Sequence, residues 1–149
     1  MTIDDKLPVM DNSWPVNARQ SVLGDWWVPL VEKAFAKMNV NYANLDGGMQ
    51  YEAIRALTGM PVEVLRTADL DEEKVWDKLK AKEQNLVTAS CLKDYNGLIG
   101  GHAYTVLGTL ELNGTRLVQL RSAVGTEKYI GPYGNSDPQW TPETKKLMQ

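Results

Sequence analysis

The dipeptide Asn113-Gly114 separates two long runs of strand-forming residues, 103–112 and 116–121. Asn-Gly is the strongest short-range signal for a two-residue hairpin turn, because both of its positions accept a positive φ. A further apolar run over 86–91 has the same strand character. The sequence therefore predicts antiparallel strands for the second half of the chain.

The first half carries helical rather than strand periodicity. A helix is predicted from Asp25, a candidate N-cap, with Pro29 in its first turn and its end near Met38. Two further helices are predicted over 51–57 and about 71–82, the last with acidic residues at its start and lysines toward its end. The apolar faces are predicted to be Trp27, Leu30, Val31, Ala34 and Met38 on the first helix and Val75, Trp76 and Leu79 on the third.

The remaining segments are irregular or short. Residues 2–20 are expected to be extended and broken by turns, 62–65 to form a short strand, and the tail after Gly125 to be an ordered loop region. Helices followed by antiparallel strands are the pattern of an α+β fold. The 149 residues contain no internal repeat and are expected to form one domain, 1–149.

Composition excludes several classes of function. The net charge is −3 with acidic and basic residues interleaved, so nucleic acid is not expected as a partner. No apolar run approaches the roughly 20 residues that a membrane span needs, and the N-terminus lacks the features of a signal peptide. A single cysteine fits a reducing compartment. We expect an intracellular, cytoplasmic protein; its oligomeric state is left open.

His102, the only histidine, lies in the glycine-rich run 100–104 just before a predicted strand. Imidazole is the side chain whose ordinary pKa lies nearest neutral pH. The motif alone favours an ordinary turn. Pairing with Cys91 would resemble a cysteine nucleophile and its base, but Cys91 ends an apolar strand pattern and is expected to pack as a small hydrophobe.

Metal and phosphate sites of familiar type are not predicted. One cysteine and one histidine do not provide the usual zinc ligands. The acidic residues 71–73 fit a helix start, and no loop has the alternating ligands of an EF-hand. The pairs Gly47-Gly48 and Gly100-Gly101 lack the lysine of a phosphate-binding loop.

The segment Gly100-Gly101-His102-Ala103-Tyr104-Thr105-Val106 closely resembles the histidine segment of calpain-type cysteine peptidases. The likeness continues in order along nearly the whole chain, which makes it more specific than any one motif. Residues 3–8 resemble the strand that opens the second catalytic subdomain. Further similar segments are the long helix at 27–38, then 41–48, 57–59, 121–125 and 129–133.

The resemblance implies a papain-like peptidase half-domain, with antiparallel β-sheets flanked by helices. In this family one subdomain carries the cysteine nucleophile, and the other carries histidine and asparagine. The chain is similar to the second part only, so His102 takes the position of the general base, and the nucleophile's segment is absent. The implied partners are a cysteine-bearing protease half or a polypeptide substrate.

Two departures from the family pattern concern the triad. Ser122 stands where the family has asparagine, and a serine hydroxyl is a shorter acceptor that need not reach the imidazole. Disturbing the orienting group of such a triad costs on the order of 10⁴-fold in rate. Val124 also replaces the tryptophan that normally shelters this site.

A third departure concerns calcium, which the family binds in this subdomain. Lys128 lies where an acidic ligand is expected and Asn135 near another, and a cation at Lys128 repels Ca²⁺. The chain also stops at Gln149, before further strands that would complete the site. No cofactor is therefore expected here, although calcium belongs to the parent family.

The resulting expectation is the histidine-bearing half of a calpain-like cysteine endopeptidase, inactive in isolation. Its catalytic residues would be His102 and Ser122, which form a degenerate triad with a weakened calcium site nearby. The alternative is a non-catalytic pseudoprotease module that binds peptides or scaffold proteins.

Overall fold

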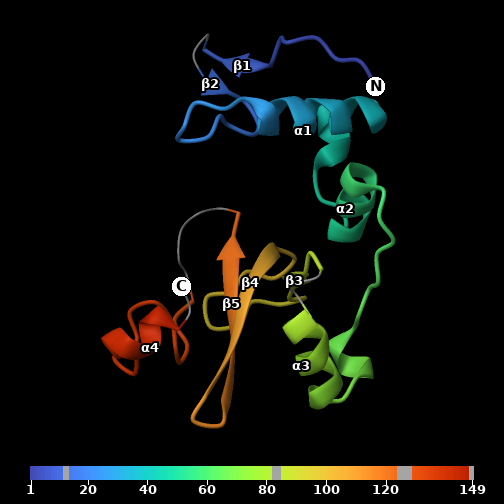
Figure 1. The fold of residues 1–149 in the computed structure, drawn as a ribbon. Coiled ribbons are helices and arrows are strands. Elements are labelled where there is room, and N and C mark those ends of the chain that lie inside the picture. The colour runs from blue at the N-terminus through green and yellow to red at the C-terminus, as the bar shows by residue number, and fades with distance from the viewer. Residues whose placement is uncertain (12–13, 82–84, 124–128, 148–149) are drawn as a thin grey trace. The chain divides into compact units, whose positions relative to one another are not determined.

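The computed structural model describes residues 1–11, 14–81, 85–123 and 129–147 (Figure 1). Helices and antiparallel sheets are both present, so the predicted α+β class is confirmed. The chain divides into two compact units, Met1–Glu52 and Ala53–Gln149, which are called the N-terminal and C-terminal units and are each described by themselves. A single domain over 1–149 stays a prediction.

The N-terminal unit begins with extended chain, as predicted. Strands β1 (Val9–Met10) and β2 (Trp14–Pro15) pair antiparallel, and a 3-10 turn, η1 (Tyr42–Leu45), follows the main helix. Residues 3–8 form no strand, so the opening strand suggested by the resemblance is wrong for this chain.

Helix α1 (Trp27–Met38) confirms the first predicted helix, but its cap is not the predicted one. Trp26 occupies the N-cap position and makes no capping hydrogen bond through its side chain. The carboxylate of Asp25 accepts instead from the hydroxyl of Ser21, at 3.1 Å. The buried residues of α1 are Pro29 and Ala36, whereas Trp27 and Met38 of the predicted apolar face are exposed.

The other two predicted helices are also present. Helix α2 (Gln50–Thr58) contains the boundary between the units, and helix α3 (Glu72–Lys80) lies within the C-terminal unit. Asp71 caps α3 by accepting the N–H of Lys74 at 2.8 Å, and this hydrogen bond lowers the pKa of the Asp71 carboxyl. The short strand predicted over 62–65 is wrong: the segment has no strand structure. A short apolar run has no periodicity with which to distinguish a strand from irregular chain.

The C-terminal unit is organised by one three-stranded antiparallel sheet in the order β3-β4-β5. Strands β4 (Ala103–Leu112) and β5 (Thr115–Ser122) form the predicted hairpin. Its turn residues Asn113 and Gly114 have φ values of 50° and 78°, the positive φ that a two-residue turn requires. Strand β3 (Thr88–Ser90) is shorter than the predicted 86–91.

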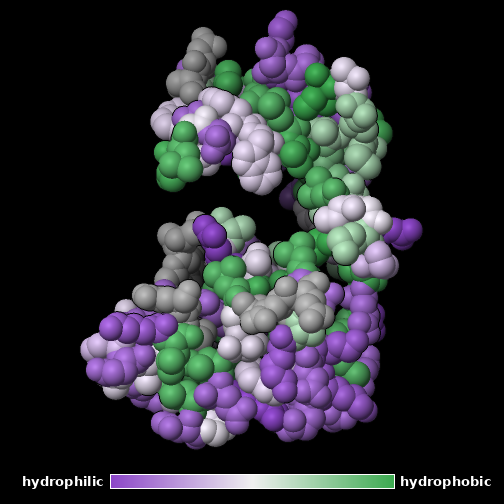
Figure 2. Space-filling view, in the orientation of Figure 1, coloured by the Kyte–Doolittle hydropathy of each residue, from purple (hydrophilic) through white to green (hydrophobic). Residues whose placement is uncertain are grey.

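One face of the hairpin packs against α3. Trp76 of α3 and Tyr104 and Val106 of β4 are buried hydrophobic residues. Arg116 of β5 lies over the Trp76 ring, 5.4 Å from its centroid, and donates two hydrogen bonds to the Glu73 carboxylate at 2.7 and 2.8 Å. These bonds raise the pKa of Arg116. The charged outer face of α3 forms a purple area in Figure 2.

The tail after Gly125, predicted to be an ordered loop region, contains a helix. Helix α4 (Pro142–Lys146) starts with a capping box between Thr141 and Thr144. In the turns before α4, the rings of Tyr133 and Trp140 pack edge-to-face with their centroids 5.3 Å apart. Thr141-Pro142, an N-cap residue followed by proline at the first helical position, was the available signal.

Candidate active site

A tight loop positions His102 at the start of β4. Gly101 has φ +70°, a conformation that favours glycine, and its N–H donates to the Cys91 carbonyl at 2.7 Å. The N–H of Gly100 donates to the Asp94 carboxylate at 2.7 Å. A Cβ on Gly100 would lie 2.8 Å from the Cα of Lys93, so a larger residue does not fit. Both glycines are therefore needed to turn the chain into β4.

The structure brings the two predicted catalytic residues together. Nε2 of His102 lies 3.1 Å from Oγ of Ser122, the last residue of β5, and both side chains are half-buried. The serine hydroxyl thus reaches the imidazole although it is shorter than asparagine. The serine contact occupies Nε2, whereas no described residue hydrogen-bonds to Nδ1.

A β-bulge at Leu107 sets this juxtaposition. Beyond the bulge the register places Tyr104 opposite Ser122. The register set by the turn alone would instead place Ala123 opposite Tyr104. Directly paired residues project to the same face of a sheet, so the bulge turns Ser122 to the face of Tyr104.

Tyr104 is a neighbour of the site that the sequence analysis missed. Its ring meets the His102 ring edge-to-face, with centroids 4.9 Å apart and planes at 85°. Its hydroxyl accepts the N–H of Ile99 at 2.8 Å. The spacing of two residues was the available signal, because alternate residues near a strand share a face.

Cys91 is not arranged as a nucleophile. It follows β3 rather than standing at a helix N-terminus, and its half-buried thiol donates to the Ile99 carbonyl at 3.2 Å. A reactive cysteine usually needs an electropositive, accessible setting. The described contacts of Cys91 favour its role as a packed residue.

The structure describes only part of the region in which the resemblance places a calcium site. Val124 and Lys128 lie outside the described residues. Asn135 is exposed, and the carboxylate of Asp137 is occupied by the N–H groups of Tyr133 and Gln139, at 2.7 and 2.8 Å. Among the residues that the structure describes, no group of three or more His, Cys, Asp or Glu side chains could hold a metal ion.

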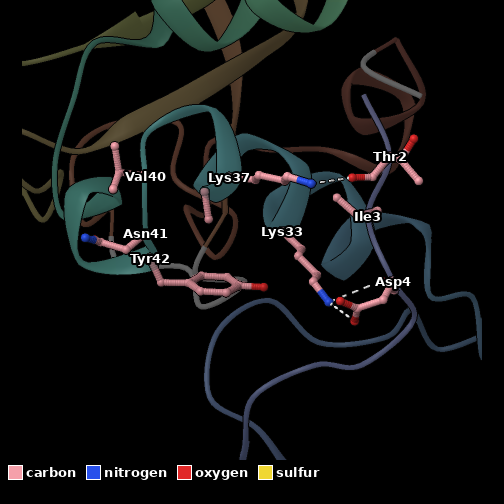
Figure 3. A pocket seen from close by; sticks show the side chains of 9 residues that line it. Thr2, Ile3, Asp4, Lys33, Lys37, Val40, Asn41 and Tyr42 are labelled. Atoms are coloured by element: carbon pink, nitrogen blue, oxygen red, sulfur yellow. Dashed lines mark hydrogen bonds and ion pairs between the residues drawn. The ribbon is translucent and has the colours of Figure 1, made fainter.

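A second candidate is an open hollow of about 570 Å³ within the N-terminal unit (Figure 3). Helix α1 contributes Lys33 and Lys37 to it, and Tyr42 points its hydroxyl toward these lysines. The Tyr42 oxygen is buried and has no hydrogen-bond partner among the described residues; its burial raises the pKa of the phenol.

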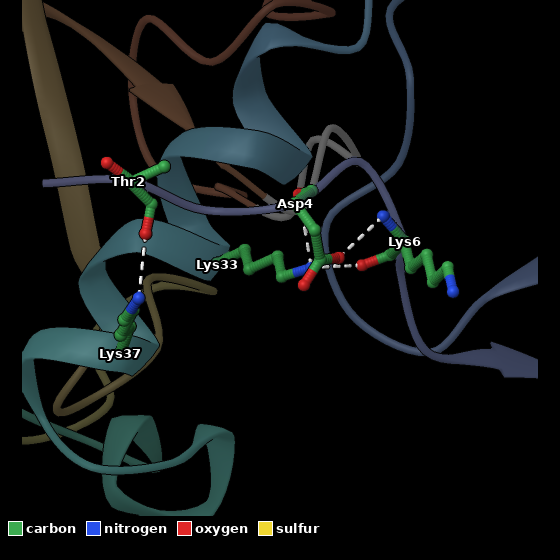
Figure 4. Close-up of polar contacts among 5 residues, drawn as sticks. All are labelled: Thr2, Asp4, Lys6, Lys33 and Lys37. Atoms are coloured by element: carbon green, nitrogen blue, oxygen red, sulfur yellow. Dashed lines mark hydrogen bonds and ion pairs between the residues drawn. The ribbon is translucent and has the colours of Figure 1, made fainter.

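The lysines of this hollow are occupied by the chain itself (Figure 4). Nζ of Lys37 donates to the Thr2 carbonyl at 2.7 Å. Nζ of Lys33 pairs with the Asp4 carboxylate and donates to the Lys6 carbonyl, and this pairing lowers the pKa of Asp4. These contacts hold residues 2–6 against α1. The lysines of the hollow are therefore better explained as structural contacts than as a ligand-binding site.

In the described part of the chain, no helix combines the length and the apolar character that crossing a membrane requires.

Comparison with known proteins adds a family to this geometry. A family model described as "calpain family cysteine protease" matches residues 1–149. The chain is 34% identical to the calpain-type cysteine protease DEK1 of Arabidopsis thaliana over all of its length, and 36% identical to calpain-12 of Mus musculus over 94% of it. It is 33% identical to a calpain of Schistosoma mansoni over 93% of its length.

The chain spans only a small part of these relatives. It covers 8% of the Arabidopsis protein, 21% of mouse calpain-12 and 20% of the Schistosoma calpain.

Proposed function

This chain belongs to the calpain family of cysteine proteases, and we propose that it is the histidine-bearing part of such a protease. In this proposal His102 is the general base and Ser122 orients it. The observation that carries the proposal is the 3.1 Å contact between Nε2 of His102 and Oγ of Ser122, where the half-buried imidazole follows a glycine turn.

The contact assigns a task to each ring nitrogen. Nε2 hydrogen-bonds to the serine, so Nδ1 would accept the proton of a cysteine thiol supplied by another part of the protease. The thiolate then attacks the peptide carbonyl, and Nδ1–H returns the proton to the leaving amine. The base works only when Nε2 carries the other proton, because Nδ1 must present a lone pair.

Serine performs the orienting task less well than an amide would. An amide oxygen only accepts and therefore holds a proton on Nε2, whereas a hydroxyl both donates and accepts. When Ser122 donates to Nε2, the imidazole proton is on Nδ1. Nδ1 then has no lone pair with which to accept the thiol proton. We infer that Ser122 leaves part of the His102 population in the unproductive tautomer, which weakens catalysis.

The isolated chain is proposed to be inactive. The thiol of Cys91 is engaged with the Ile99 carbonyl, so the nucleophile must come from a cysteine-bearing half. Three tryptophans of the N-terminal unit are exposed, as expected of side chains that a partner protein would cover; they are Trp14, Trp26 and Trp27. An intracellular, cytoplasmic location remains a prediction from the sequence.

The second candidate is a pseudoprotease that binds peptides or scaffold proteins without cleaving them. The presence of Ser122 in place of asparagine favours it. A site that no longer catalyses does not need His102 to be held in the tautomer with its proton on Nε2. Peptide binding by this module would not depend on the imidazole.

Reconstitution tests the proposal. The chain is mixed with the cysteine-bearing half of its parent protein, and hydrolysis of a fluorogenic peptide is measured. We expect no hydrolysis by the chain alone, hydrolysis by the mixture, and a loss of about 10³-fold with His102→Ala, the size of a general-base contribution. Ser122→Asn should raise the rate, and Lys74→Ala on the exposed face of α3 is the matched control.

Two outcomes would contradict the first candidate. A mixture whose rate survives His102→Ala has another base. A mixture that assembles and binds peptide, but hydrolyses none with either serine or asparagine at position 122, supports the pseudoprotease instead.

A further inference from the structure

We propose that Tyr104 is a positioning residue for His102, acting on the imidazole through its ring and on the preceding loop through its hydroxyl. The catalytic meaning of this inference rests on the function proposed above, but its effect on the imidazole does not.

The first contact is between the rings. Tyr104 is 7% exposed, so its ring is a fixed part of the hairpin core. It meets His102 edge-to-face at 4.9 Å and 85°, a geometry that aromatic pairs favour. One side of the imidazole therefore packs against a buried ring.

The second contact runs through the backbone of Ile99. The Tyr104 hydroxyl accepts the N–H of Ile99 at 2.8 Å, and the Ile99 carbonyl accepts the N–H of His102 at 3.3 Å. The same carbonyl accepts from the thiol of Cys91 at 3.2 Å. The Tyr104 hydroxyl thus closes the loop over residues 99–104 and fixes the backbone from which the imidazole projects.

The third relation is the position of Ser122. Tyr104 is its cross-strand partner in the β4–β5 ladder, so the residue that seats the imidazole also lies opposite the residue that hydrogen-bonds to it. Tyr104 therefore contacts the loop and the imidazole ring, and it is paired with Ser122 across the strands. The other side chains that hydrogen-bond to this loop are less buried: Cys91 is half-buried and Asp94 is exposed. Tyr104 therefore supplies the buried support of this site.

The sole histidine makes a direct test possible on the whole chain. With ¹⁵N-labelled histidine, one pair of imidazole signals reports the Nε2–H and Nδ1–H populations at a pH of about 8.5, where an ordinary imidazole is neutral. Tyr104→Phe keeps the ring but leaves the Ile99 N–H without its acceptor. We expect the ratio of the two tautomers to change about threefold or more, on the scale of one hydrogen bond.

Two control variants separate positioning from stability. Tyr95→Phe removes the hydroxyl of an exposed tyrosine in the same loop, and its spectrum should match that of the wild type. Val106→Ala weakens the same buried strand face, and it should lower the unfolding midpoint without changing the tautomer ratio. Amide exchange of Ile99 in the wild type requires no variant and should be protected.

The inference is overturned if Tyr104→Phe leaves the imidazole signals unchanged, if Val106→Ala changes them equally, or if the Ile99 amide exchanges as an open loop. In the reconstituted protease, Tyr104→Phe should lower kcat about tenfold with KM unchanged, as expected for lost orientation. A mixture without activity, combined with the expected spectra, would refute the proposed function and leave the positioning role intact.

Discussion

The two ends of the β4–β5 hairpin are built from different interactions. At the tip end, next to the Asn113-Gly114 turn, Arg116 lies over Trp76 and binds Glu73 of α3. At the base end, where β4 begins and β5 finishes, the imidazole of His102 is held by one hydrogen bond to Ser122 and by the loop in front of it.

This difference suggests that the tip end contributes mainly to folding stability, whereas the base end mainly orients the imidazole. The tip end buries a large aromatic side chain, and burial of apolar area is the dominant favourable term in folding. The base end also buries an aromatic ring, that of Tyr104, but the imidazole of His102 is held there by a hydrogen bond, which contributes about 1 kcal/mol net and mainly fixes direction. A change at one end should therefore affect a different property from a change at the other.

The largest effect is expected for Trp76→Ala at the tip end. Trp76 is 6% exposed, and truncating a buried tryptophan costs about 3–5 kcal/mol in the free energy of unfolding. Urea unfolding measures this loss, with Lys74→Ala on the same helix as the control. The imidazole spectrum of the folded fraction should stay as in the wild type. A changed tautomer ratio would show that the two ends are coupled, and the comparison would fail.

A smaller effect is expected for Arg116→Gln. Its ion pair with Glu73 is partly solvated, so the stability lost should be well below that of Trp76→Ala. A double-mutant cycle with Glu73→Gln should return a favourable coupling free energy that falls as salt is added, because added ions screen such a pair. Zero coupling at low salt would mean that Arg116 acts only through its contact with the Trp76 ring.

The hairpin could be predicted because its signal is local. Asn113-Gly114 fixes the turn through two positive φ values, and runs of strand-forming residues flank it on both sides. The cap of α1 could not be predicted, because Ser21 competes for the Asp25 carboxylate from outside the helix. Helix α4 shows the opposite case, because Thr141 followed by Pro142 is a local signal for a helix start, yet the prediction for this segment was a loop.

The candidate site was only partly readable from the sequence. Residue types and the family resemblance singled out His102 and Ser122, but their contact depends on the bulge at Leu107. No residue pattern predicts that bulge, and without it Ser122 would face the other side of the sheet. The support from Tyr104 through Ile99 is likewise a tertiary contact that spacing alone does not specify.

The central claim is that the Ser122 hydroxyl holds Nε2 of His102, and Ser122→Ala tests it most directly. The ¹⁵N imidazole spectrum of the wild-type chain is compared with that of this variant at a pH of about 8.5, where an ordinary imidazole is neutral. The account predicts that the Nε2 signal shifts and that the tautomer ratio changes when the hydroxyl is removed. Superimposable spectra would show that the serine does not touch the imidazole, and would contradict the account.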